Sequence, residues 1–110
     1  MVESNKLMAK FLGYSYHHKH NQVYFAGWSK GKSREYLCRT HQQLKFDTDW
    51  NWLMKVVEKI EEIGSVRIQE NYCDILNKNT EYYIEVVNQP TKIQAVYSAC
   101  LQFIQNESND

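Results

Sequence analysis

The apolar residues in positions 52–63 recur every three or four residues, and this spacing places them on one face of a helix. The face consists of Trp52, Leu53, Val56, Val57, Ile60 and Ile63. Asp47 or Thr48 is predicted to cap the start of this helix, and Gly64 is predicted to end it. A helix with one apolar face must bury that face against another element, so the chain is restricted to a layered fold.

Beyond this helix the spacing of apolar residues changes from helical to alternating, which is the pattern of half-buried strands. Three stretches show it, at positions 66–69, 73–75 and 82–87. The polar stretch 77–80 predicts a hairpin between the second and third strands, because asparagine tolerates the left-handed conformation of a tight reversal. Pro90 then prevents the last strand from continuing.

Two more stretches of the chain have helical spacing. The first is predicted to begin at an N-cap, Ser4, and to end at Gly13. The second is predicted to begin at Thr91, because Gln94 three residues later completes a capping box. The apolar faces are Leu7, Met8, Phe11 and Leu12 in the first, and Ile93, Val96, Tyr97, Cys100, Phe103 and Ile104 in the second. Residues 105–110 are polar and are predicted to form a frayed tail.

A second hairpin is predicted earlier in the chain. Residues 22–28 and 34–39 are β-prone stretches that flank the polar stretch 29–33. A chain of 110 residues has the usual size of one domain. We therefore predict a single α+β domain over residues 1–110, with three helices packed on a mostly antiparallel sheet of about four strands. The order of layers would be that of an α/β/α sandwich.

Composition excludes several classes of protein. Thirteen basic and thirteen acidic residues give zero formal net charge, which argues against a surface built entirely for nucleic acid. No apolar run approaches the roughly 18 residues that a membrane span needs. Residues 1–5 lack the apolar core of a signal peptide, so a cytoplasmic, reducing location is predicted. Cys38, Cys73 and Cys100 form no C-x-x-C pair and indicate neither a disulfide framework nor a thiolate cluster.

Three stretches of the sequence resemble a known family. They are Asn5-Lys6-Leu7-Met8-Ala9-Lys10-Phe11-Leu12-Gly13, Asp49-Trp50-Asn51-Trp52-Leu53-Met54-Lys55-Val56-Val57-Glu58-Lys59-Ile60-Glu61 and Lys92-Ile93-Gln94-Ala95-Val96-Tyr97. In this order they resemble the phage ABA sandwich domain family, small phage and prophage proteins, in a form associated with gut Bacteroidetes. The resemblance covers the helices, about half the chain. It implies helices on both sides of a sheet and a phage or prophage genome, and it carries over no catalytic or binding residue.

Charge is distributed unevenly along the chain. Positions 14–46 contain six Lys and Arg residues and a single acid, Glu35. Aromatic side chains are interleaved with these cations, and cations that hold phosphates beside rings that stack on bases are typical of nucleic-acid binding. The candidate nucleic-acid-binding residues are Lys19, Lys30, Lys32, Arg34, Arg39, Tyr24 and Trp28. The other aromatic residues of the segment are Tyr14, Tyr16, Phe25, Tyr36 and Phe46. An ordinary amphipathic hairpin has the same composition, so this alternative stays open.

The same segment contains the residue types that bind zinc. Neutral imidazole and thiolate are preferred zinc ligands, and the candidates are His17, His20, Cys38 and His41, with His18 beside them. Only Cys38 and His41 approach the paired spacing of a structural site, and histidines in a solvated loop are the simpler interpretation. A cysteine nucleophile at Cys38 would need an exposed, activated thiolate, for which there is no local signature.

Trp50 and Trp52 cannot share one direction on a helix, because residues two apart diverge by about 200°. We expect both to anchor the core, while a partly exposed pair is the alternative. Asp47 and Asp49 are explained by capping, so paired-acid catalysis is not indicated. The sequence also has no Gly-rich phosphate loop, no nucleophile elbow and no helix-turn-helix spacing.

These observations predict a non-enzymatic accessory or interaction protein of phage or prophage type, without a cofactor. Its contact surface would be the basic and aromatic segment 14–46, and its partner a protein or a nucleic acid. The first alternative is a nucleic-acid-binding module that uses segment 17–45. The second is a small zinc-binding module.

Overall fold

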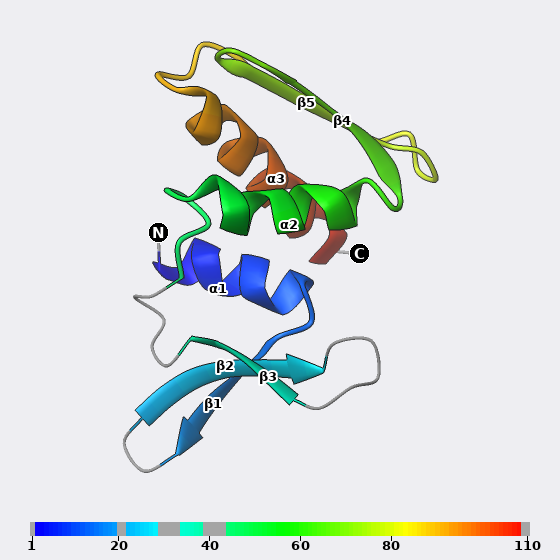
Figure 1. Cartoon of the computed structure of the whole chain (residues 1–110). Coiled ribbons are helices and arrows are strands. Elements are labelled where there is room, and N and C mark those ends of the chain that lie inside the picture. The colour runs from blue at the N-terminus through cyan, green and yellow to red at the C-terminus, as the bar shows by residue number, and fades with distance from the viewer. Residues whose placement is uncertain (1, 20–21, 29–33, 39–43, 109–110) are drawn as a thin grey trace. The chain divides into compact units, whose positions relative to one another are not determined.

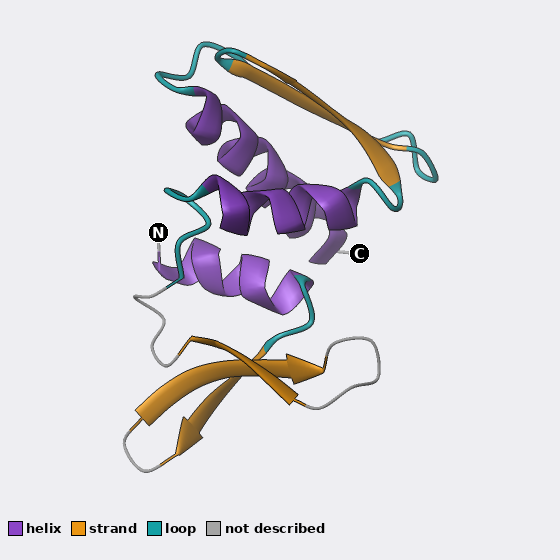
Figure 2. Cartoon of the chain, viewed as in Figure 1, coloured by secondary structure: helices purple, strands orange, loops and turns teal. Residues whose placement is uncertain are grey.

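The computed structural model describes residues 2–19, 22–28, 34–38 and 44–108, and in the first three strands it describes the backbone (Figure 1). The architecture is α+β, with three helices and antiparallel sheet, as predicted. The chain divides into two compact units, residues 1–45 and residues 46–110. Each unit has its own helix or helices and its own three-stranded sheet (Figure 2).

The first unit consists of one helix followed by three strands. Its elements are α1 (Val2–Phe11), β1 (Ser15–Lys19), β2 (Gln22–Trp28) and β3 (Arg34–Cys38). The strands form an antiparallel sheet in the order β1-β2-β3. The predicted hairpin of β2 and β3 is confirmed. Strand β1 was not predicted, because its sequence SYHHK has no apolar alternation.

Helix α1 ends as predicted but begins earlier. It starts at Val2, so Ser4 lies within the helix and is not its N-cap. Gly13 adopts the left-handed conformation, with φ of 97°, and the amide after it bonds back to the Ala9 carbonyl at 3.0 Å. The buried side chain of Asn5 donates from Nδ2 to the Leu44 carbonyl at 3.1 Å, which fastens the helix to the end of this unit.

The second unit places two helices on one side of a sheet. Its elements are α2 (Trp50–Ile60), β4 (Gly64–Gln69), β5 (Tyr72–Asn77), β6 (Tyr83–Val86) and α3 (Lys92–Ser108). The strands are antiparallel in the order β4-β5-β6. Helix α3 packs on all three strands, and α2 packs on α3 and β4 (Figure 1). All three strands were predicted, because their apolar residues alternate.

The core of this unit lies between the sheet and the helices. The sheet contributes Cys73, Ile75, Ile84 and Val86, and the helices contribute Leu53, Val56, Val57, Ile60, Val96, Cys100 and Phe103, all of them buried. Most of the predicted apolar faces of α2 and α3 are therefore confirmed, while Trp52, Ile63 and Ile93 are only half-buried. Burial of a Leu, Ile, Val or Phe side chain contributes roughly 1.5–3 kcal/mol to stability, so this layer is the main source of the unit's stability.

The predicted single sheet of about four strands is not formed by the described residues. Six strands are present instead, in two sheets of three. Each strand pairs only with its neighbours in sequence, and α2 separates β3 from β4, so the antiparallel pairing stays local. Both helices of the second unit lie on the same side of its sheet, so within this unit the α/β/α order of layers is not found (Figure 1).

The ends of α2 differ from the prediction. Its N-cap is Asp49, whose Oδ1 accepts a hydrogen bond from the Asn51 amide at 2.8 Å, and not Asp47 or Thr48. The helix ends at Ile60, and Gly64 is the buried first residue of β4 instead of a helix end. The helix therefore starts later and ends earlier than predicted, and Ile63, the last residue of the predicted apolar face, lies beyond its end.

Helix α3 begins as predicted. The Thr91 hydroxyl accepts from the Gln94 amide at 3.3 Å and donates to Oε1 of the Gln94 side chain at 3.0 Å. The hydrogen bond from the Gln94 amide to the Thr91 hydroxyl, one of the two bonds of a capping box, is therefore confirmed. The Gln94 side chain accepts from the Thr91 hydroxyl instead of bonding the Thr91 backbone amide. The helix continues to Ser108, so its last turn lies within the range 105–110 that the sequence assigned to a polar tail.

The β5–β6 hairpin is organised by one buried asparagine. Oδ1 of Asn77 accepts from the amides of Asn79 and Thr80 at 2.9 and 3.1 Å, and Nδ2 donates to Oε1 of Glu107 at 2.9 Å. The left-handed residue of this loop is Glu81, with φ of 62°, and not one of its asparagines. Asn77 therefore forms an Asx turn and also ties the hairpin to the end of α3.

Candidate interaction surface on the second sheet

The sheet of the second unit has one face turned away from its helices. The outward side chains of its strands are Ser65, Arg67 and Gln69 on β4, Tyr72, Asp74 and Leu76 on β5, and Tyr83 and Glu85 on β6. We call these eight residues, with Val87 just after β6, the outer face. The register places Arg67 opposite Asp74 and Asp74 opposite Glu85, so a charged row crosses all three strands.

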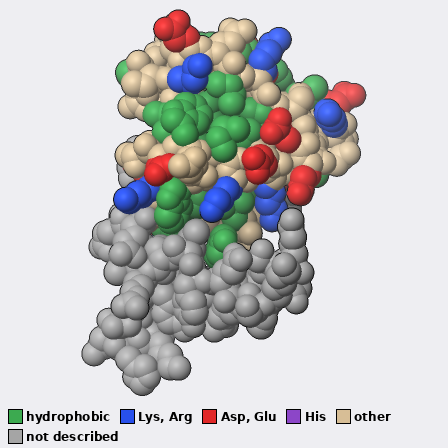
Figure 3. Space-filling model, viewed as in Figure 1, with side chains coloured by type: hydrophobic (Ala, Val, Ile, Leu, Met, Phe, Trp, Pro, Cys, Tyr) green, Lys and Arg blue, Asp and Glu red, His purple; other side chains and the backbone are tan. Residues whose placement is uncertain are grey.

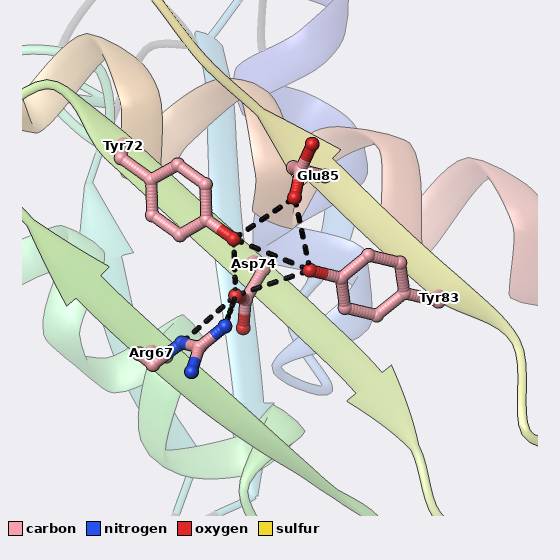
Figure 4. A network of polar contacts seen from close by, with 5 residues as sticks. All are labelled: Arg67, Tyr72, Asp74, Tyr83 and Glu85. Carbon is pink, nitrogen blue, oxygen red and sulfur yellow. Dashed lines mark hydrogen bonds and ion pairs between the residues drawn. The ribbon is translucent and has the colours of Figure 1, made fainter.

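Two tyrosine hydroxyls and the charged row form one polar network (Figure 4). Arg67 donates to Oδ2 of Asp74 from Nε at 2.9 Å and from Nη2 at 2.6 Å. The hydroxyls of Tyr72 and Tyr83 lie 2.5 and 3.2 Å from the same oxygen. Both hydroxyls also lie within reach of Oε2 of Glu85, at 3.1 and 3.2 Å, and 3.2 Å from each other.

The network offsets a repulsion that the strand register creates. Asp74 and Glu85 are direct cross-strand partners, and like charges in such positions destabilise a sheet. Asp74 is also only 6% exposed, and a buried charge requires pairing and hydrogen bonding. The guanidinium of Arg67 and the phenols of Tyr72 and Tyr83 provide both, because every one of these groups can donate to a carboxylate oxygen.

The network shifts the pKa values of Asp74, Tyr72 and Arg67. Burial alone would raise the pKa of Asp74, but hydrogen bonds from Tyr72, Arg67 and Tyr83 outweigh it and lower that pKa. The hydrogen bond to Asp74 raises the pKa of Tyr72, and bonding to the same carboxylate raises the pKa of Arg67. At neutral pH Asp74 is therefore a carboxylate, Tyr72 a neutral phenol and Arg67 a cation.

We expect Asp74→Asn to lower the free energy of unfolding at pH 7 by about 1–3 kcal/mol, because charge-assisted hydrogen bonds are lost. The lowered folded-state pKa also predicts the pH dependence. The contribution of Asp74 is fully present above its unfolded-state value of 3.8 and is lost as the pH falls through the folded value. Urea denaturation at pH 7 and below pH 4 should therefore show a smaller acid-induced loss in Asp74→Asn than in wild type. Equal losses would contradict this assignment.

The residues predicted from sequence to bind nucleic acid lie in the first unit. The register of β2 and β3 places Trp28 opposite Arg34, which brings an aromatic and a basic residue of the prediction together. Tyr24 lies opposite His17, and Lys19 lies opposite Gln22 at the end of the β1–β2 pair. The remaining members of the set, Lys30, Lys32 and Arg39, fall outside the described residues.

The predicted zinc ligands are described only in part. His17 lies on β1 and Cys38 lies on β3, opposite Phe25, while His20 and His41 fall outside the described residues. Among the residues that the structure does describe, no group of three His, Cys, Asp or Glu side chains could hold a metal ion.

The two cysteines of the second unit are buried thiols. Burial raises the pKa of Cys73 to about 12 and also raises the pKa of Cys100. At neutral pH both are therefore protonated, and neither has the thiolate character of a nucleophile.

The two tryptophans of α2 have different environments. Trp52 packs edge-on against the fully buried ring of Phe46, with centroids 5.2 Å apart and planes at 88°, so its predicted role in the core is confirmed. Trp50 is 37% exposed, so the same prediction for Trp50 is wrong. In Figure 3 hydrophobic side chains reach the surface over α2 and the first half of α3. Phe46, which the sequence grouped with the aromatic residues of segment 14–46, is buried in the core and therefore cannot stack on a base.

The two units carry opposite charge. Residues 1–45 contain eight Lys and Arg against two Glu, whereas residues 46–110 contain five Lys and Arg against eleven Asp and Glu. The formal charges are therefore plus six and minus six, although the chain as a whole is neutral. A basic partner and an acidic partner would accordingly be attracted to different units.

The outer face was not predicted from the sequence. Its residues alternate with the buried ones, so their direction could be read from the apolar pattern. The charged row could not be predicted, because it depends on the pairing of β5 with both β4 and β6. A shift of either pairing by one residue would separate its members.

Comparisons with known proteins do not assign this chain to a family. A scan against protein-family models, a search of curated proteins and a search of solved structures each found no match. The resemblance to the phage ABA sandwich domain family therefore stays a prediction. In the described part of the chain, no helix combines the length and apolar character needed to span a bilayer.

Proposed function

We propose that this chain is a non-enzymatic interaction protein whose outer face contacts a protein partner. The observation that carries the proposal is the exposure of large side chains around the polar network. Tyr83 is 48% exposed, Val87 44% and Leu76 36%, on the side of the sheet that the helices of the unit do not cover. A phage or prophage setting and a cytoplasmic location, proposed from the sequence, are compatible with such a role.

The composition of the outer face is typical of protein interfaces. Tyrosine and arginine are enriched in interface centres and among the residues that dominate binding energy. Here Tyr72, Tyr83 and Arg67 are already held by hydrogen bonds to Asp74, so fewer rotamers are lost when a partner binds. Leu76, near the end of the central strand β5, and Val87, just after β6, add apolar area at opposite ends of the same face.

The protonation states of the outer face support a role without catalysis. A general acid or base works best when its pKa lies near the operating pH. The pKa of Asp74 is lowered and that of Tyr72 is raised, so both are moved away from neutrality. Hydrolysis of a nucleotide or phosphoester by the purified chain, lost in Asp74→Asn, would contradict this part of the proposal.

We expect Leu76→Asp to abolish retention of the partner by the immobilised chain. The substitution adds charge at an exposed apolar position of the outer face and leaves the buried core of the sheet intact. The matched control is Gln102→Asp, which adds the same charge at an exposed position of α3. In affinity capture from a bacterial lysate, a specific partner is retained by wild type and Gln102→Asp only. Equal retention by all three proteins would refute the outer face as the contact surface.

A second candidate function, nucleic-acid binding, is favoured by the charge of the first unit. Eight Lys and Arg residues fall in residues 1–45, and the register sets Trp28 opposite Arg34. If Arg34 holds a phosphate, Arg34→Gln should lower the slope of log affinity against log salt by about one. Fluorescence anisotropy with single- and double-stranded DNA and RNA at several salt concentrations measures this slope. Lys55→Gln on α2 is the control, and an unchanged slope in Arg34→Gln would exclude the contact.

A further inference from the structure

The outer face has more negative than positive charge. Its central row contains two carboxylates, Asp74 and Glu85, and one guanidinium, that of Arg67, which pairs with Asp74 at 2.6 Å. Glu85 is exposed on the edge strand β6, and the unit around it contains eleven acidic against five basic residues. Charge complementarity therefore favours a basic partner, with Glu85 as the carboxylate that it meets.

The network also has fewer hydroxyl protons than it has contacts between oxygen atoms. The oxygens Asp74 Oδ2, Glu85 Oε2 and the two hydroxyls of Tyr72 and Tyr83 make five contacts of 2.5 to 3.2 Å among themselves. The two phenols supply only two protons, so at most two of these contacts are hydrogen bonds at any moment. The complementary group for such an oxygen-rich surface is one that brings several N–H donors and a positive charge.

We infer that the protein partner of the outer face presents an arginine side chain to Glu85, beside the rings of Tyr72 and Tyr83. This inference rests on the proposed function. A guanidinium has five donors in one plane, bonds a carboxylate through two parallel hydrogen bonds and stacks on aromatic rings. A lysine ammonium supplies the charge but not the planar pair of N–H donors that can bond both carboxylate oxygens. A second copy of the outer face would bring another excess carboxylate, so face-to-face pairing of two copies lacks this complementarity.

The test is a titration of the full chain, labelled with nitrogen-15, with the capped peptide acetyl-Ala-Arg-Ala-amide. We expect saturable changes in the amide resonances of Tyr72, Asp74 and Glu85. The matched peptide with citrulline, which has the same shape and no charge, should bind about tenfold more weakly. Equal binding of both peptides, absence of binding, or changes confined to other parts of the chain would overturn the inference.

Two variants separate a specific contact from general attraction to an acidic unit. Glu85→Gln should weaken binding of the arginine peptide about tenfold, because the hydrogen-bonded charge partner is removed. Glu58→Gln on α2 removes the same charge at another exposed position and should leave binding unchanged. An equal effect of the two variants would overturn the inference. Tyr83→Phe keeps the ring and removes a competing donor to Glu85, so it should bind at least as tightly as wild type.

The captured partner distinguishes failure of this inference from failure of the proposed function. If Leu76→Asp abolishes capture and Glu85→Gln leaves it unchanged, the outer face binds a protein without an arginine contact at Glu85, and only the present inference fails. If Leu76→Asp has no effect, the proposed function fails as well. A salt-sensitive dimer of the purified chain, dissociated by Glu85→Gln in sedimentation velocity, would assign the surface to a second copy and overturn the inference of a separate protein.

Discussion

Gly64→Ala is expected to lower the free energy of unfolding by about 3 kcal/mol, the upper part of the usual range for overpacking. A Cβ atom at this position would lie 2.3 Å from the carbonyl oxygen of Leu76. That oxygen belongs to the backbone of β5, the central strand, so it cannot move without displacing the register partner Asn77. The first pair of the β4–β5 ladder would have to separate.

Urea denaturation followed by far-UV circular dichroism measures this loss. Ser65→Ala is the control in the same strand, because Ser65 is exposed and its replacement should change stability by less than about 0.5 kcal/mol. Gly13→Ala gives a second comparison. A Cβ there meets nothing within 4 Å, but φ is 97°, so the expected cost is conformational and about 1–2 kcal/mol. A Gly64→Ala variant as stable as Ser65→Ala would contradict the steric argument.

Gly64 also illustrates which parts of the fold the sequence predicts. A glycine after a helical pattern indicates a helix end, and this interpretation was correct for Gly13. At Gly64 the same signal was misleading, because the glycine is needed for close approach of another strand. The difference depends on a contact with Leu76, twelve residues away, which local spacing cannot reveal.

Periodicity predicted those elements that bury an apolar face. Helices α2 and α3 and strands β4 to β6 each have a set of apolar residues at the correct spacing, and all were found. Strand β1 was missed, because its sequence SYHHK has no apolar alternation and only its backbone pairing with β2 reveals it. The number of sheets was also missed, because strand pairing is a tertiary property that no repeat in the sequence encodes.

The candidate surface depends on register for the same reason. Asp74, Tyr83 and Glu85 fall in stretches whose alternation predicted strands, but no spacing in the sequence singles them out as a site. Only the cross-strand pairing converts them into one network with Arg67 and Tyr72. The sequence directed attention to the basic segment instead, since a run of charges is visible without any knowledge of pairing.

Phe46→Ala is expected to lower the free energy of unfolding by about 3–5 kcal/mol, the range for truncation of a buried aromatic side chain. Phe46 is fully buried and packs edge-on against Trp52 at 5.2 Å. The sequence had grouped Phe46 with aromatic residues that could stack on nucleic-acid bases. A core role and a stacking role give opposite results, because loss of a stacking residue weakens ligand binding and leaves stability unchanged.

Trp50→Ala is the matched control, because Trp50 lies in the same unit and its ring is partly exposed. Its side chain stays 37% exposed, so its replacement removes a smaller buried fraction and should cost less than Phe46→Ala. The two variants are compared by urea denaturation with circular dichroism, which does not depend on tryptophan as a probe. A cost for Phe46→Ala as small as that for Trp50→Ala would mean that the edge-on pair does not anchor α2. A large cost in Phe46→Ala alone would show that the Phe46–Trp52 contact belongs to the core and that Trp50 contributes little to stability.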